Sequence, residues 1–83
     1  MNMRTDNHLI KSLSERLFVR VATEQWKDLE MVKKEITVTK TYEALQNRES
    51  EFYTKSVEEL MYLLELEEKR DIETWERQAI WKY

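Results

Sequence analysis

The chain has 83 residues, of which 41% are hydrophobic and 37% charged, and a formal net charge of −3; this suits one small domain rather than a catalytic domain joined to a second one. The absence of cysteine excludes disulfides, thiolate metal sites and cysteine nucleophiles, and it favours a reducing, cytoplasmic location. The absence of glycine excludes glycine-rich phosphate loops and nucleophile elbows, because those turns need backbone conformations that glycine tolerates.

The first half of the chain carries two apolar stripes at helical spacing. We expect a helix capped by Thr5 or Asp6, with residues 1–5 disordered. The stripes lie roughly 100° apart on that helix. The first contains Ile10, Leu13, Leu17 and Val21, and the second contains Phe18, Ala22, Trp26, Leu29, Val32 and Ile36.

Two interpretations of this change of face are open. One long or kinked helix touches two partners, which is the interpretation we favour, or the chain breaks near Ala22 and restarts with Thr23 as a cap. Residues 36–42 alternate with a period of two and are rich in β-branched side chains, which is typical of a strand. An α+β fold with a two-stranded element at 17–22 and 36–42 is therefore the alternative to an all-α fold.

The C-terminal half predicts a long helix from about residue 55 to 81. Ser56 and Glu59 have the spacing of a capping box ahead of an apolar stripe. The stripe that we expect to face the core contains Tyr53, Val57, Leu60, Met61, Leu64, Ile72, Trp75 and Ala79. The favoured fold is a small all-α domain over 1–83, a two- or three-helix antiparallel bundle with a long C-terminal helix.

This helix has a second apolar facet, which a helix that forms only one wall of a small bundle does not need. It carries Phe52, Leu63, Leu66 and Trp81. Since a chain of this size buries only about 60–65% of its extended surface, we expect some of these groups to remain exposed and to form an interface. The competing interpretation is that the facet is internal core.

The last residues of the chain are rich in side chains that anchor interfaces. Trp81 and Tyr83 lie on different faces at the terminus, with Arg77 one turn before them. We predict that Phe52, Leu63, Leu66, Arg77, Trp81 and Tyr83 form a partner-binding surface. Packing of Tyr83 into the domain's own groove is the alternative.

The sequence offers little equipment for catalysis. His8 is the only histidine, so no imidazole pair or nucleophile triad is available. The acidic series Glu65, Glu68 and Asp71 is spaced along one helix, but Lys69 and Arg70 lie within it, which favours a solvated ion-paired face over a Mg²⁺ site. We therefore expect no enzymatic activity, no cofactor and no metal ion.

Charge is divided unequally between the two halves. Residues 1–41 hold eight basic and six acidic residues, whereas residues 42–83 hold six and eleven. A nucleic-acid-binding regulator that uses the basic half, with Trp26 as a stacking group, is one alternative. Its basic residues, which are scattered around the helix, are Arg16, Arg20, Lys27, Lys33, Lys34 and Lys40.

The function we predict is protein binding. The chain lacks chemical equipment and carries a surplus of large apolar residues on a charged helix, which favours a small regulator, inhibitor or adaptor that occupies a partner's surface. A homodimer is compatible with the same surplus. Cysteine-free charged helical proteins of this size are common among phage and mobile-element products that antagonise host factors. Neither a membrane span nor a signal peptide is indicated.

Overall fold

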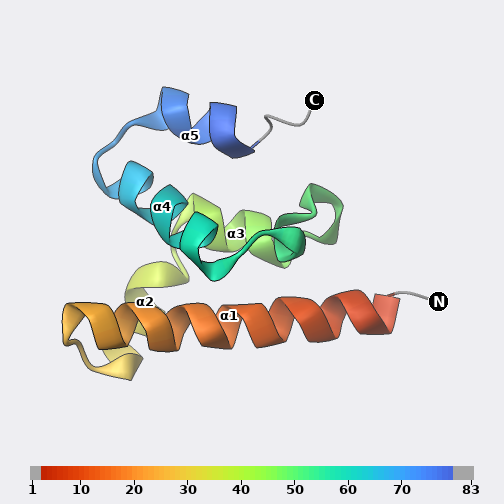
Figure 1. The fold of residues 1–83 in the computed structure, drawn as a ribbon, viewed down its shortest axis with the longest axis horizontal. Coiled ribbons are helices and arrows are strands. Elements are labelled where there is room, and N and C mark those ends of the chain that lie inside the picture. Colours follow the sequence, from red (N-terminus) through yellow and green to blue (C-terminus); the bar gives the residue numbers. More distant parts are fainter. Residues whose placement is uncertain (1–2, 80–83) are drawn as a thin grey trace.

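The protein is all-α. The computed structural model describes residues 3–79, with side chains from Asn7 onward. Within these residues, five α-helices and two short 3₁₀ helices follow one another, and no strand is present (Figure 1). They are α1 (Met3–Gln25), α2 (Leu29–Ile36), α3 (Lys40–Gln46), η1 (Arg48–Ser50), η2 (Phe52–Thr54), α4 (Val57–Glu68) and α5 (Ile72–Ala79).

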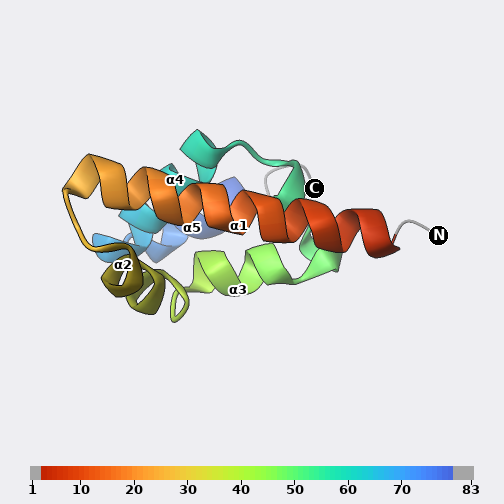
Figure 2. The ribbon, with the colours of Figure 1, turned by 90° about the horizontal axis from the view of Figure 1, so that it is seen from below.

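The long helix α1 is the element on which the others assemble. It contacts α2, α3 and α4, while α5 packs against α4. Seen from below, α2 and α3 lie on one side of the axis of α1, whereas α4 starts on the other side and passes behind α1 (Figure 2). Because α4 packs against both α1 and α5, its side chains are covered from two directions.

Side-chain caps start the helices. Asp28 accepts a hydrogen bond from the backbone N–H of Glu30 at the start of α2, and Thr39 accepts one from Tyr42 at the start of α3. The predicted capping box at α4 is confirmed: Ser56 and Glu59 each accept a hydrogen bond from the other's backbone N–H, at 3.1 and 2.9 Å. Helix α1 begins at Met3, so Thr5 and Asp6 lie within the helix and not at the cap position where we expected them.

The favoured interpretation of the first half, one long or kinked helix, is wrong, because the chain breaks between two helices. The break lies later than the position near Ala22 that the alternative predicted. Helix α1 continues to Gln25 and α2 starts after Asp28, so Asp28 rather than Thr23 is the new cap. Met3 to Thr5 are also helical, whereas we expected residues 1–5 to be disordered; residues 1 and 2 lie outside the described part.

The prediction of one continuous helix over 55–81 is wrong. The chain leaves the helix at Lys69 and re-enters it at Ile72. Arg70 has a left-handed φ of 61°, and the backbone N–H of Asp71 donates to the carbonyl of Leu66 at 2.9 Å. This is the hydrogen bond of a Schellman motif, a helix ending that glycine normally provides.

The alternative with two strands is also wrong. Residues 17–22 lie inside α1, and residues 36–42 form the end of α2, a turn and the start of α3. The β-branched residues of this segment serve the turn instead: Thr37 and Thr39 donate side-chain hydrogen bonds to the carbonyls of Lys34 and Ile36. Such local bonds compete with strand formation.

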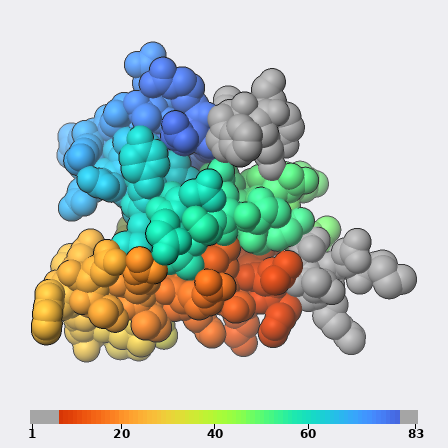
Figure 3. Space-filling view, viewed as in Figure 1, coloured from red at the N-terminus to blue at the C-terminus, as the bar shows by residue number. Residues whose placement is uncertain are grey.

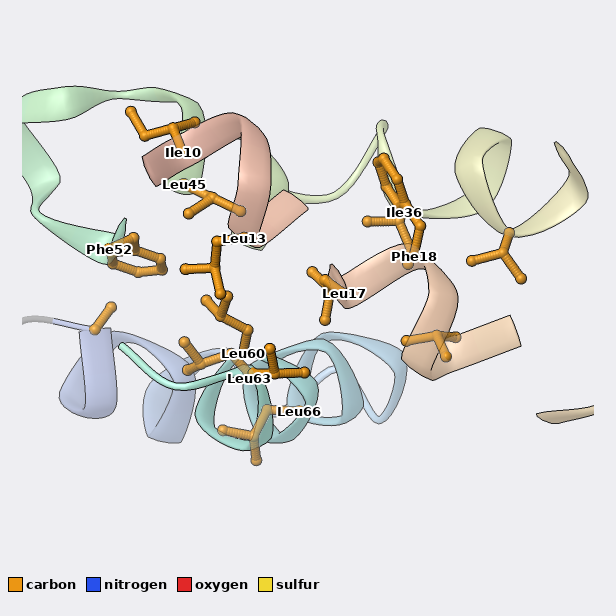
Figure 4. Close-up of a cluster of buried hydrophobic side chains, with 14 of the residues drawn as sticks. Ile10, Leu13, Leu17, Phe18, Ile36, Leu45, Phe52, Leu60, Leu63 and Leu66 are labelled. Carbon is orange, nitrogen blue, oxygen red and sulfur yellow. The ribbon is translucent and has the colours of Figure 1, made fainter. Parts of the chain in front are cut away.

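The buried apolar side chains form one cluster at the junction of α1, α3 and α4. Leu60 and Leu63 point from α4 toward Leu13 and Leu17 of α1, and Phe18 lies beside Ile36 (Figure 4). The first predicted stripe of α1 is confirmed as core. The cluster contains Ile10, Leu13, Leu17, Phe18, Val21, Val32, Ile36, Leu45, Phe52, Val57, Leu60, Leu63, Leu66, Trp75 and Ala79.

A polar network connects α3, α4 and α5. Glu67 accepts hydrogen bonds from the backbone N–H groups of Lys40 and Thr41, at 2.8 and 2.7 Å, and from the Thr41 hydroxyl. The buried Trp75 indole donates to the same hydroxyl at 2.9 Å, and the Lys40 ammonium lies 4.9 Å from the Trp75 ring centroid. A carboxylate on α4 therefore caps α3.

Candidate functional site

The predicted partner-binding facet is inside the molecule. Phe52, Leu63 and Leu66 are only 3%, 2% and 6% exposed, so the expectation that they stay exposed is wrong. Two neighbours cover this facet: Leu63 faces α1, and the break at Arg70 folds α5 back against α4, where the rings of Trp75 and Phe52 lie 6.3 Å apart.

The remaining predicted contact residues have different positions. Arg77 is exposed on α5, where its guanidinium donates to the Thr74 hydroxyl at 3.3 Å. Trp81 and Tyr83 lie outside the described residues. The structure therefore brings together Phe52, Leu63 and Leu66 as core, and Arg77 does not join them.

Trp26, in the turn between α1 and α2, is the most exposed large apolar side chain of the described residues. It is 94% exposed, and its backbone has a left-handed φ of 55°. The backbone N–H of Lys27 donates to the carbonyl of Ala22 at 3.1 Å, which makes Trp26 the left-handed residue that closes α1. Neither the exposure nor the backbone conformation favours a tryptophan at this position.

The turn around Trp26 is open to solvent along its whole length. Every residue from 23 to 30 is exposed, and the next apolar residues, Leu29 and Met31, are 38% and 52% exposed. Because Leu29 and Met31 follow Trp26 within five residues and are also exposed, they add apolar surface to this end of the chain's first helix pair. We call residues 23–31 the α1–α2 tip.

A groove of about 960 Å³ begins beside this tip. It runs between the end of α1, the link from α2 to α3, and α4, and the space-filling view is indented between the orange end of α1 and the cyan part of α4 (Figure 3). We call it the α1–α4 groove. It is lined by Arg20, Val21, Glu24, Gln25, Lys27, Glu35, Ile36, Val38, Thr39, Glu58, Met61, Tyr62, Leu64, Glu65, Glu67 and Glu68.

The groove has apolar side chains and an acidic rim. Met61 and Leu64, which we expected to face the core, are half-buried here, while Val38 and Tyr62 are 83% and 46% exposed. Six glutamates line the groove against one arginine and one lysine, a formal charge of −4. The groove therefore combines apolar side chains with a net negative charge.

Ion pairs organise part of this rim. The Arg20 guanidinium contacts Glu24 at 2.9 Å and Glu58 at 3.0 Å, so it joins α1 to α4. Hydrogen bonds to Glu24 and Glu58 raise the pKa of Arg20. The pKa of Glu58 lies below its ordinary value because the carboxylate accepts a hydrogen bond from its own backbone amide and another from Arg20. The Glu58 carboxylate is therefore charged at neutral pH.

The single histidine and a buried serine have different environments. His8 is exposed on α1, whereas Ser14 is buried with its hydroxyl donating to the carbonyl of Ile10 and accepting from Gln46. In the described residues, no group of three histidine, cysteine, aspartate or glutamate side chains could hold a metal ion. No helix within 3–79 is long and apolar enough to cross a membrane.

Acidic partners occupy several of the basic residues of the first half. Arg20 pairs with Glu24 and Glu58, while Lys27 and Lys33 have ion pairs with Glu35 and Glu30. A row of neighbouring acidic groups weakens attraction for a phosphate backbone.

Comparison with known proteins gives no relative: no family model, curated protein or solved structure matches this chain.

Sequence reasoning missed both features of this end of the molecule. It considered Trp26 for base stacking, but the periodicity assigned this residue to an apolar helix face. The signal that was present is the change of apolar face near Ala22, shortly before α1 ends at Gln25. The groove left no signal because its walls come from segments far apart in sequence.

Proposed function

We propose that this protein is a non-enzymatic protein-binding module, a regulator, inhibitor or adaptor that occupies a partner's surface through its α1–α2 tip. The observation that carries the proposal is Trp26, which is 94% exposed and in a left-handed backbone conformation. Backbone outliers of this kind gather at functional sites. Tryptophan is also the residue type most enriched among energetic anchors of interfaces.

Burial of the Trp26 side chain in an interface would release a large amount of free energy. A tryptophan buries about 150–250 Å² at an interface, which at about 25 cal/mol per Å² corresponds to roughly 4–6 kcal/mol before the cost of association. In the free protein this gain is unrealised, because the indole lies in water. A partner with an apolar pocket would realise it.

Composition supplies the cellular context of this proposal. The cysteine-free, highly charged chain favours a cytoplasmic protein, and proteins of this type are common among phage and mobile-element products that antagonise a host factor. His8 on an exposed surface and Ser14 within a buried hydrogen-bond chain support a non-enzymatic role.

The experiment compares what copurifies with three tagged versions of the protein from its native cell: the wild type, Trp26→Gly and Leu9→Ala. Leu9 is the control because it is another exposed apolar side chain, about 25 Å from Trp26 along α1. We expect a stoichiometric partner with the wild type and Leu9→Ala and its loss, by at least about tenfold, with Trp26→Gly.

Other outcomes contradict the proposal in identifiable ways. If Trp26→Gly retains the partner as well as the wild type does, the α1–α2 tip is not the binding surface. A nuclease-sensitive complex favours the nucleic-acid-binding alternative, in which Trp26 stacks on bases and binding falls steeply with salt. Recovery of the chain with itself, measured by sedimentation, favours a homodimer.

A further inference from the structure

One side of α4 forms a continuous row of residues along the α1–α4 groove. Along α4, Glu58, Met61, Glu65 and Glu68 follow one another at intervals of three or four residues, so they lie on one side of the helix. This row extends over about 15 Å, or three helical turns. The exposed Val38 and Tyr62 add apolar surface to it.

The charge of the groove is only partly neutralised from within. Glu24 and Glu58 share one guanidinium, Lys27 pairs with Glu35 at 3.0 Å, and Lys69, outside the groove, pairs with Glu65 at 3.0 Å. Glu68 is exposed and has no ion pair with any residue in the described part of the chain. An excess of negative charge therefore faces the open side of the groove.

We propose that this groove binds an amphipathic helix of a partner protein that carries lysine or arginine beside its apolar stripe. The inference rests on the proposed protein-binding function and specifies the chemistry of the partner. Apolar side chains of the incoming helix would pack on Met61 and Leu64, and its cations would face Glu58 and Glu68. The adjacent Trp26 indole suits a cation as well, because cations are attracted to aromatic faces.

The same charge argues against the other large classes of ligand. Nucleic acid and anionic membrane surfaces would meet the glutamates of the rim with like charge. A neutral apolar helix would fit the side chains of the groove but would leave the rim carboxylates facing no cation. Charge complementarity thus selects the cationic helix among these occupants.

The test uses a fluorescein-labelled amphipathic peptide of about 18 residues, built from leucine and lysine at helical spacing, and a matched leucine and glutamate peptide. Anisotropy measures binding to the wild type and to the matched charge reversals Glu68→Lys, in the groove, and Glu76→Lys, exposed on α5. We expect the lysine peptide to bind, Glu68→Lys to weaken it by at least about fivefold, and Glu76→Lys to change it by less than about twofold.

Each remaining outcome overturns the inference. If Glu68→Lys and Glu76→Lys weaken peptide binding equally, the peptide is attracted to the whole surface and not to the groove. If the glutamate peptide binds as tightly as the lysine peptide, the charge of the peptide does not determine binding. Binding of wild-type protein to anionic vesicles or DNA in place of the peptide assigns the groove to another ligand. Circular dichroism verifies that both variants are folded.

The inference and the proposed function fail separately. If the native partner is lost with Trp26→Gly but retained with Glu68→Lys, the tip binds the partner and the groove does not. If it is lost with Glu68→Lys but not with Trp26→Gly, the groove is the docking site and the role of Trp26 is wrong.

Discussion

Three residues of the described chain hold a positive φ, and none of them is a glycine: Trp26, Glu51 and Arg70. At a helix end this conformation costs an L-amino acid roughly 1–2 kcal/mol, because the Cβ atom approaches the following carbonyl oxygen. Trp26 buries no compensating apolar surface within the protein. Trp26 therefore lowers the stability of the free protein. We propose that burial of its indole against a partner offsets this cost.

Replacing Trp26 by glycine should stabilise the isolated protein. We expect the free energy of unfolding to rise by about 1 kcal/mol with Trp26→Gly, because glycine adopts the left-handed conformation without the clash. Urea denaturation measures the change. Arg70→Gly, at the same position of the α4 ending, should give a similar gain; a loss of stability at position 26 would show that the indole supports the fold.

The Glu58 carboxylate should make part of the stability dependent on pH. Its pKa lies below the ordinary value of 4.5 because of hydrogen bonds from its own backbone amide and from Arg20. A lowered folded pKa means that the stabilisation is complete above the ordinary glutamate pKa and is lost as the pH falls through the lowered value.

The measurement is the Tm difference between the wild type and Glu58→Gln across this range. We expect the wild type to melt higher at about pH 7 and the difference to shrink in acid, as the pH falls below the ordinary glutamate value of 4.5. Glu76→Gln, on an exposed face of α5, should show no difference at either pH. A Glu58→Gln difference that persisted in acid would mean that packing, not ionisation, produces it.

At the scale of the elements, the contact that holds α3 to α4 and α5 is polar. Glu67 satisfies two backbone N–H groups at the start of α3, and Thr41 relays the contact to the Trp75 indole. We expect Glu67→Gln to lower the free energy of unfolding by about 1–2 kcal/mol, because an amide removes the negative charge and places a donor beside donors.

Its neighbour Glu68 provides the matched control for this prediction. The exposed Glu68 carboxylate accepts no hydrogen bond from the start of α3, so Glu68→Gln should change stability by less than about 0.5 kcal/mol. Chemical denaturation of the two variants side by side checks both values. Equal effects would mean that the cap at α3 contributes nothing to the fold.

The sequence predicted helix content well and helix ends poorly. The Ser56 and Glu59 spacing and the stripe beginning at Ile10 were sufficient, because they are local patterns. The endings at Trp26 and Arg70 left no such pattern, since the residues that normally mark a left-handed position, glycine and asparagine, do not occupy them. Asn47, a candidate for this conformation by residue type, has a φ of −90° and caps η1.

The predicted core stripe of α4 is correct only in part. Leu60 is buried as expected, but Leu63 and Leu66 are also core, while Met61 and Leu64 of the expected stripe are half-buried and line the groove. Which of two apolar facets is buried depends on tertiary neighbours, and periodicity along one helix carries no information about them.

For the whole molecule, the unequal charge of the two halves has a structural counterpart. The acidic second half, with six basic and eleven acidic residues, supplies most of the groove's carboxylates, from α4. The basic first half is partly neutralised by its own ion pairs. Composition thus indicated the excess of acidic residues in the second half but not that they line a groove.

Site-directed photocrosslinking in the native cell identifies the molecules that touch the α1–α2 tip. A benzoylphenylalanine replaces Leu29, next to Trp26, or Glu76 on α5 as the control. The account predicts a discrete protein adduct from position 29 and none from position 76. An empty result at position 29, or the same adducts from both positions, would contradict it.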